Sequence, residues 1–244
     1  MKKIIVGNWK MNPPSVEEAV SLARAVAEHV KHPMFNKNVE VVLAPPFIFL
    51  YKVYETLYGG KVKLAGQDVF WEKAGAYTGE VSPAQLKNLG AAYVIVGHSE
   101  RRALGETDEI VGRKLTAVLE AGMTPILCVG EPADVRERGM EAAKEFVGKQ
   151  LEVIEHKVFE GIIAYEPVWA IGTGNNATPG DAAEMITLIK SLVTSYRLPI
   201  PVLYGGSVTS GNAGDFLNRE EIDGLLVGGG SLNAEEFGEI CRGA

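Results

Sequence analysis

Residues 161–169 read GIIAYEPVW, an apolar run that ends at Tyr165 and passes directly into Glu166 and Pro167. A short run of this kind, rich in β-branched residues, is typical of a strand that is covered on both faces in a parallel sheet. Seven further runs share this character, and together they predict eight strands at 3–7, 39–44, 62–66, 93–97, 124–129, 161–165, 202–204 and 224–227.

The segments between these runs have helical patterns with recognisable start signals. Ser15 followed by Glu18 has the spacing of a capping box, and an apolar face then recurs at helical intervals. Ser82 and Gln85 repeat the signature around a proline, and Gly90 is a suitable C-terminal stop. Strand and helix therefore alternate along the chain.

The chain has 244 residues, and no Pro- or Ser-rich linker divides it. We therefore expect one α/β domain over residues 1–244: a parallel eight-stranded (β/α)8 barrel surrounded by helices. A doubly wound open sheet is the alternative. That fold predicts a glycine-rich dinucleotide turn after the first strand, whereas residues 7–10 read GNWK.

Composition narrows the possible partners and compartments. A formal net charge of −7 and a pI near 5.3 argue against a nucleic-acid or anionic-membrane partner. The basic N-terminus lacks the apolar core of a signal peptide, and the longest apolar stretch, residues 41–51, contains two prolines, so we expect a cytoplasmic protein. Cys128 and Cys241 lack metal-type spacing, and Cys128 is expected to be a buried, reduced thiol.

Polar residues follow several of the predicted strands, and in a barrel this end of the strands carries the chemistry. Each residue alone has an ordinary structural explanation, such as a solvated loop lysine or a packed histidine. Their combination favours an active site for an anionic substrate: an acid, an imidazole and an ammonium group at one end, with glycine-rich loops after the seventh and eighth strands. The residues concerned are Asn8, Lys10, His98, Glu166, Ser207, Gly228 and Gly229.

The segments 8–12, 97–102, 165–174, 204–208 and 227–232 resemble the signatures of the triose-phosphate isomerase family, in the family's order and spacing across the whole chain. This enzyme gives the TIM barrel its name. The resemblance implies interconversion of dihydroxyacetone phosphate and D-glyceraldehyde 3-phosphate through an enediolate, in glycolysis and gluconeogenesis. It implies neither a metal nor an organic cofactor, because proton transfer needs no electron sink beyond the carbonyl.

The resemblance also assigns roles to individual residues. Glu166 would be the base, with its basicity raised in a water-poor site. His98 would be a neutral electrophile, because Ser99 begins a helical turn whose positive end disfavours imidazolium, as generally described for this enzyme. Lys10 would supply positive charge and Asn8 a hydrogen bond at the substrate oxygens. The phosphate would be held by backbone N–H groups of Gly172, Ser207, Gly228 and Gly229.

Supporting residues follow from the same resemblance. Glu100 would lie near Lys10, and residues 168–177 would form a lid that dries the site. Glu131 and Tyr165 would hold Trp169 in the open lid, and Tyr204 and Ser207 would receive the closed lid. The segment 76–80 resembles a dimer loop that places Thr78 beside the partner's catalytic face, which implies a homodimer. The chain departs from the family pattern at Asn175, Gly230 and Asn233.

Two other functions are compatible with a barrel. One is another phosphosugar isomerase, such as one of amino-acid biosynthesis, which would share the phosphate loops but use different catalytic groups. The other is a barrel retained as a non-enzymatic binding scaffold. The segments 8–10 and 165–167 argue against the first, and intact Lys10, His98 and Glu166 argue against the second.

Overall fold

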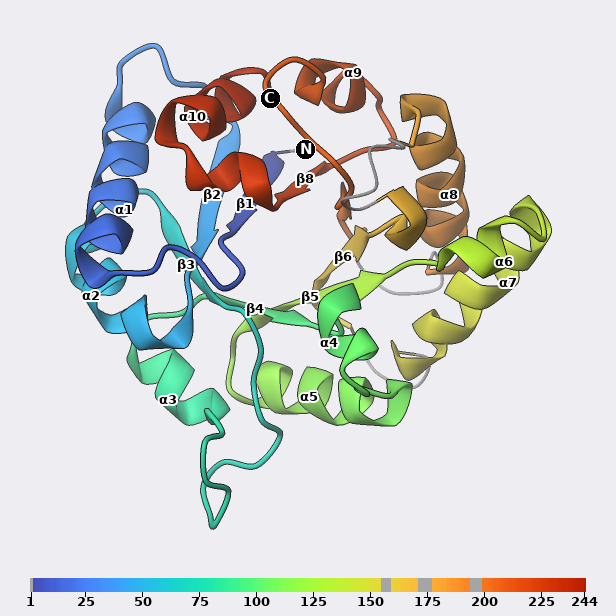
Figure 1. The fold of residues 1–244 in the computed structure, drawn as a ribbon, viewed down its shortest axis with the longest axis horizontal. Coiled ribbons are helices and arrows are strands. Elements are labelled where there is room, and N and C mark those ends of the chain that lie inside the picture. The colour runs from blue at the N-terminus through green and yellow to red at the C-terminus, as the bar shows by residue number, and fades with distance from the viewer. Residues whose placement is uncertain (1, 155–158, 171–176, 194–198) are drawn as a thin grey trace.

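The computed structural model describes residues 2–154, 159–170, 177–193 and 199–244. Its strands are all parallel and close into a barrel in the order of the sequence, which Figure 1 shows in a view down the ring. The predicted (β/α)8 barrel is therefore confirmed. The strands are β1 (Lys3–Asn8), β2 (Val39–Ala44), β3 (Lys63–Gly66), β4 (Tyr93–Val96), β5 (Thr124–Val129), β6 (Ile162–Tyr165), β7 (Val202–Tyr204) and β8 (Gly224–Val227).

Helices form an outer ring around the barrel (Figure 1). Within the described residues, no helix is both long and apolar enough to cross a membrane. The α-helices are α1 (Val16–Lys31), α2 (Phe47–Leu57), α3 (Pro83–Asn88), α4 (Ser99–Ala103), α5 (Asp108–Glu120), α6 (Ala133–Arg136), α7 (Met140–Leu151), α8 (Pro179–Leu192), α9 (Ala213–Leu217) and α10 (Ala234–Arg242). The described residues also contain the 3₁₀ turns η1 (Glu152–Ile154), η2 (Val168–Ala170) and η3 (Gly229–Leu232).

Strand boundaries agree with the sequence prediction to within one residue. β1 extends one residue further than expected, because Asn8 still pairs with Ala44 of β2. β4 ends before Gly97, whose φ of +72° leaves the extended region. These two differences lie at carboxyl ends, where the backbone turns toward the loops of the site, whereas β3 and β6 each begin one residue later than expected.

The core has two layers, as expected for strands covered on both faces. Helices and strands share the outer layer, in which Trp9, Leu50 and Phe237 are fully or almost fully buried. The barrel interior is filled by a second set of side chains, so it is a packed core rather than a channel. This set consists of Val6, Val42, Ala44, Ala65, Ile95, Ile126, Cys128, Ile162, Ala164, Leu203 and Leu226.

The predicted helix starts are largely confirmed. Ser82 and Gln85 form a complete capping box, with Pro83 in the first turn. Ser15 caps α1 by accepting a hydrogen bond from the N–H of Glu18, but the expected return bond is replaced: the Ser15 hydroxyl donates to the Glu18 carboxylate at 3.0 Å. The Glu18 carboxylate therefore binds the Ser15 hydroxyl, whereas in a complete capping box it would accept the backbone N–H of Ser15.

We expect Gly224→Ala to unfold the barrel at its closing seam. A Cβ atom at Gly224 would lie 1.9 Å from the carbonyl oxygen of Ile4, and the next nearest atoms are also backbone atoms of Ile4, which cannot move aside as a flexible side chain could. The variant should lose about 3 kcal/mol or more of unfolding free energy in urea titration. Gly112→Ala is the control. Gly112 lies inside α5 with only Val153 at 3.9 Å, so alanine should stabilise the helix by about 0.5–1 kcal/mol.

Candidate active site

An opening of about 250 Å³ lies at the end of the barrel where the strands finish. It is lined from β1, from the loop after β4, and from the two glycine-rich loops after β7 and β8. The lining residues are Asn8, Lys10, His98, Gly205, Gly206, Ser207, Val208, Thr209, Leu226, Gly228, Gly229 and Gly230. The structure therefore brings six of the predicted site residues, Asn8, Lys10, His98, Ser207, Gly228 and Gly229, into one pocket.

A strained turn after β1 directs Lys10 into this pocket. Lys10 has a φ of +52°, which is uncommon for a residue with a side chain and costs on the order of 1 kcal/mol. Hydrogen bonds hold the turn: the Lys10 N–H donates to Asn8 Oδ1 at 3.0 Å, and Gln67 Nε2 donates at 2.8 Å to the carbonyls of Lys10 and Ala44. These contacts fix the position of the ammonium group.

The Lys10 ammonium is paired but partly accessible. Its Nζ lies 2.6 Å from Glu100 Oε1, and the two side chains are 29% and 54% exposed. Gly228 gives the lysine room, since a Cβ there would lie 3.2 Å from Lys10 Cε. Exposure weakens the ion pair through solvent screening, so the ammonium group can also interact with an anionic ligand.

The carboxylate of Glu166 and the imidazole of His98 are in direct contact. Glu166 Oε1 lies 2.9 Å from His98 Nε2, and Glu166 Oε2 accepts a hydrogen bond from the N–H of Ser99 at 2.9 Å. Both residues are buried. The Glu166 N–H donates to the Val129 carbonyl at 2.8 Å, which continues the β5–β6 ladder beyond Tyr165. The backbone of Glu166 is thus fixed to the barrel wall.

The hydrogen bonds of His98 define its tautomer. His98 precedes α4, and its Nδ1 accepts the N–H of Glu100 at 3.2 Å, so Nε2 carries the proton and donates to Glu166. Burial lowers the pKa of His98, but the nearby carboxylate of Glu166 outweighs burial and raises it above the ordinary value. The helix N–H opposes protonation at Nδ1. The hydrogen bond at Nδ1 fits a neutral imidazole, but the raised pKa means that the resting contact with Glu166 favours imidazolium, contrary to the expectation.

The expectation that a water-poor site raises the pKa of Glu166 is wrong for this geometry. Burial raises the pKa of the carboxyl, but the His98 imidazole and the Ser99 N–H stabilise the carboxylate more, so the pKa is lowered. Glu166 also does not line the 250 Å³ opening. It lines a second, mainly apolar cavity of about 210 Å³ together with Cys128, Phe146 and Val168.

The glycine-rich loops lie opposite His98 in the pocket. Gly229 begins η3, so its N–H has no partner within that turn. The Ser207 hydroxyl lies 3.2 Å from the carbonyl of Ala170 at the base of the predicted lid. Gly172, also predicted to bind phosphate, and residues 171–176 of the predicted lid lie outside the described residues.

The predicted hinge partners of the lid are in contact. Glu131 is fully buried and accepts hydrogen bonds from Tyr165 Oη at 3.0 Å and from Trp169 Nε1 at 2.8 Å. Arg136 balances its charge at 3.6 Å and lies 5.1 Å over the Trp169 ring. Tyr204 is buried, and its hydroxyl has no hydrogen-bond partner among the residues the structure describes.

The other two predicted site residues lie away from the pocket. Cys128 is a buried, free thiol in the barrel interior, and burial followed by the charge of Glu166 raises its pKa well above the ordinary value. Thr78 lies in the long connection between β3 and α3, the segment that projects furthest from the barrel in Figure 1. A single chain therefore does not bring Thr78 to its own pocket.

Sequence reasoning missed two supporting residues, Gln67 and Arg136, and the contact of Ser99 with Glu166. Gln67 follows β3 directly, so inspecting the end of that strand would have found it. Ser99 acts through its backbone N–H, which no side-chain motif reports. Arg136 carries no local signal, because its role beside Glu131 and Trp169 depends on the packing of α6 against η2.

A closed (β/α)8 barrel with a buried carboxylate–imidazole contact beside a glycine-lined opening is characteristic of a barrel enzyme that performs acid–base chemistry on a small anion. A family model described as triosephosphate isomerase matches residues 3–244. The chain belongs to the triosephosphate isomerase family. Named relatives include triosephosphate isomerases from Aquifex aeolicus, 44% identical over 98% of both chains, and from Thermoanaerobacter pseudethanolicus, 43% identical over 99% of both. The triosephosphate isomerase of Saccharopolyspora erythraea is 44% identical over 97% of this chain and 94% of its own.

We expect Glu166→Gln to lower the pKa of His98. The substitution removes the charge that raises the pKa and leaves the desolvation that lowers it, so the imidazole should titrate below its ordinary value. Nitrogen-detected NMR of the imidazole against pH measures this. Glu184→Gln on α8 is the control with the same change of charge, and it should leave the titration in place. A pKa of His98 that is unchanged by Glu166→Gln would contradict the assigned contact.

Proposed function

We propose that this chain interconverts dihydroxyacetone phosphate and D-glyceraldehyde 3-phosphate by proton transfer through an enediolate. The observation that carries the proposal is the direct contact of Glu166 with His98, which shares one opening with Lys10, in a barrel of the triosephosphate isomerase family. The relatives' name states the reaction class, and the site supplies a base, a hydrogen-bond donor and a cation for it.

Glu166 takes the proton from the carbon beside the carbonyl. To reach a substrate in the 250 Å³ opening, its carboxylate leaves the Ser99 N–H and the side of the 210 Å³ cavity. Leaving a hydrogen-bond donor and a hydrogen-bonded imidazole raises the pKa of a buried carboxyl. The base is therefore stabilised as a carboxylate at rest and becomes more basic when it turns toward the substrate.

His98 and Lys10 stabilise the enediolate oxygens. When Glu166 turns away, the Nε2–H of His98 becomes free to donate to a substrate oxygen, while Nδ1 stays bonded to the Glu100 N–H. Lys10 adds a positive charge from the facing wall, and Asn8 positions the Lys10 turn. The phosphate is bound by N–H groups of Ser207, Gly228 and Gly229, with Gly172 of the lid. The roles of Glu166 and His98 match the general description of triosephosphate isomerase.

The whole chain, residues 1–244, acts as one catalytic domain in the cytoplasm, in glycolysis and gluconeogenesis. Proton transfer beside a carbonyl uses the carbonyl itself as the electron sink, so the proposal includes no metal and no organic cofactor. The net charge of −7 supports a small-molecule substrate over nucleic acid or an anionic membrane as the partner.

The chain acts as a homodimer in which Thr78 reaches the partner's catalytic mouth. The projecting connection between β3 and α3 is stiffened by aromatic contacts, with Phe70 4.0 Å from Trp71 and 4.6 Å from Tyr77 between ring centroids. Apolar side chains on its tip and beside the catalytic turn are exposed, among them Tyr77 at 45% and Met11 at 93%. Exposed apolar surface of this kind favours an interface.

We expect Glu166→Gln to keep the fold and phosphate affinity while losing at least about 10²-fold in turnover, the usual scale for a positioned base. A coupled assay with glyceraldehyde 3-phosphate measures turnover, and inhibition by inorganic phosphate measures the affinity. Glu184→Gln, remote from the site, should retain parental rates. Near-parental turnover in a folded Glu166→Gln protein would remove this residue from the mechanism.

Shortening residues 76–80 should give monomers of low activity, because the proposed dimer loop supports Asn8 and Lys10 of the partner. Analytical ultracentrifugation measures the assembly, and the same coupled assay measures turnover. Fully active monomers would refute the link between assembly and catalysis. Dimers that persist after the shortening would refute the role of the loop in the interface.

A further inference from the structure

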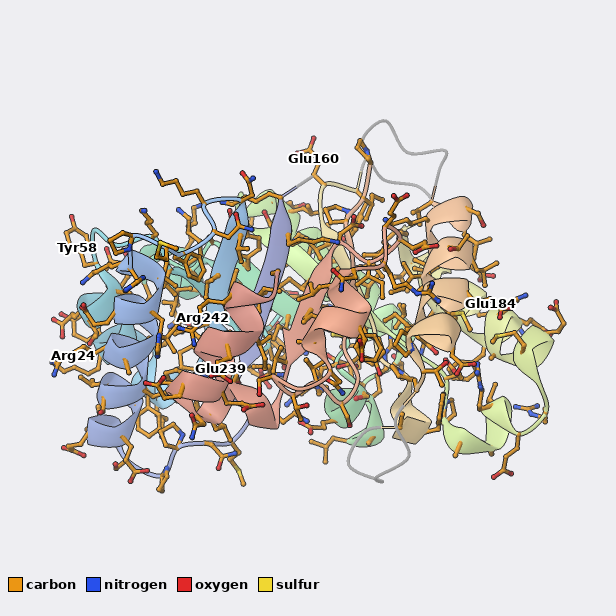
Figure 2. The ribbon with its side chains drawn as sticks, turned by 90° about the horizontal axis from the view of Figure 1, so that it is seen from above. Arg24, Tyr58, Glu160, Glu184, Glu239 and Arg242 are labelled. Carbon is orange, nitrogen blue, oxygen red and sulfur yellow. The ribbon has the colours of Figure 1, made fainter. Side chains whose placement is uncertain are left out.

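A second pocket lies at the other end of the barrel, where β1, β2 and β3 begin. In Figure 2 this end faces upward, marked by Tyr58 just after α2 and by Glu160 just before β6. The pocket has a volume of about 450 Å³. It is lined by Lys2, Val30, Lys31, His32, Pro33, Phe35, Asn36, Lys37, Val39, Val41, Gly60, Lys61 and Lys63.

The charge of this lining is opposite to that of the whole chain. The lining contains five lysines and no aspartate or glutamate, although the chain carries a net charge of −7. Like charges placed around one opening repel each other, and that repulsion opposes folding. The cluster therefore creates a local positive potential that the overall composition does not predict.

Three of these lysines have no ion-pair partner in the described part of the chain. Lys2 pairs with Glu40 and Lys31 with Glu28, each at 2.9 Å. Lys37, Lys61 and Lys63 pair with no carboxylate among the described residues, and all three are exposed. Ammonium groups without a carboxylate partner are available to an anion.

Carboxylates also contact other residues of the lining: Glu40 binds Lys2, and the C-terminal Ala244 accepts a hydrogen bond from Asn36 Nδ2 at 2.8 Å. Glu40 receives hydrogen bonds from Lys2 Nζ and from the Tyr93 hydroxyl, and those bonds keep its pKa below the ordinary value despite burial. A carboxylate that is held by two donors compensates less charge elsewhere. Lys63 also interacts electrostatically with Glu40, so the charge of these lysines is partly compensated.

The pocket also has an apolar wall. Val30, Phe35, Val39 and Val41 are buried and line one side of it. A concave site of a few hundred Å³ with an apolar wall and convergent charges has the size and character of a small-molecule site rather than of a polymer track. The lysines supply charge, and the wall supplies a surface for a non-polar part of a ligand.

We propose that this pocket binds a small polyanion that carries two or more phosphate groups. Three ammonium groups that form no ion pair within the described residues match a multiply charged anion better than a monoanion. The site lies at the opposite end of the strands from Lys10, His98 and Glu166, so it is separate from the catalytic mouth. The proposal does not depend on the proposed isomerase activity.

Isothermal titration of the full-length protein with inorganic triphosphate at low ionic strength tests the proposal. The pocket variant combines Lys37→Ser, Lys61→Ser and Lys63→Ser. The control combines Lys52→Ser, Lys73→Ser and Lys149→Ser, which removes the same charge from exposed sites elsewhere. A third protein, Lys10→Met, reports binding at the catalytic mouth. The coupled isomerase assay and circular dichroism show whether each triple variant remains folded.

The pocket variant should bind triphosphate at least about fivefold more weakly, given a few tenths of a kcal/mol for each exposed charge contact. The control and Lys10→Met should stay within about twofold of the parent, and both triple variants should keep parental turnover. If triphosphate binding weakened equally in both triple variants, the loss would come from net charge alone, and the proposal would be overturned. The proposal would also be overturned if Lys10→Met abolished triphosphate binding or if the parent bound no triphosphate. Tighter binding of a polyglutamate peptide than of triphosphate would overturn it as well.

Discussion

The pairing of β1 with β8 is the constraint on which the rest of the structure depends. These strands come from the two ends of the chain, and their register, from Ile4 opposite Gly224 to Gly7 opposite Val227, closes the sheet into a ring. Closure forces the carboxyl ends of all eight strands around one opening. The Ser231 hydroxyl therefore lies 3.4 Å from the Asn8 carbonyl, although 223 positions separate them. Gly224 permits this approach because it has no side chain.

The closed ring also determines which groups surround the buried carboxylates of Glu166 and Glu131. Glu166 is 2% exposed, and an isolated carboxylate at that depth would take up a proton. The contact with His98 and the Ser99 N–H keeps it ionised, at the expense of its basicity. Glu131 is buried in the same way and is held by Tyr165 and Trp169. In both places the hydrogen-bond donors to a buried acid come from neighbouring strands and loops, so the carboxylates are held in a fixed orientation.

The two ends of the barrel differ in how their lysines are paired. At the carboxyl end, Lys10 is matched by Glu100 at 2.6 Å, which holds a single cation in place beside the pocket. At the amino end, Lys37, Lys61 and Lys63 border a larger opening without carboxylates in its lining. The chain therefore has two local regions that can attract anions despite its net charge of −7. They lie at opposite ends of the packed barrel interior.

The sequence by itself determined the number, order and approximate limits of the strands, and with them the barrel, because apolar runs and helix caps are local signals. It also placed Asn8, Lys10, His98 and Glu166 at one end, because parallel strands of a closed ring finish on the same side. Only the tertiary structure decided the state of those groups. The pKa of Glu166 depends on Ser99 and His98, which lie on another strand's loop, and Gln67 and Arg136 act through contacts made in the folded chain. Through-space distances set such interactions, and a linear pattern of residue types does not encode them.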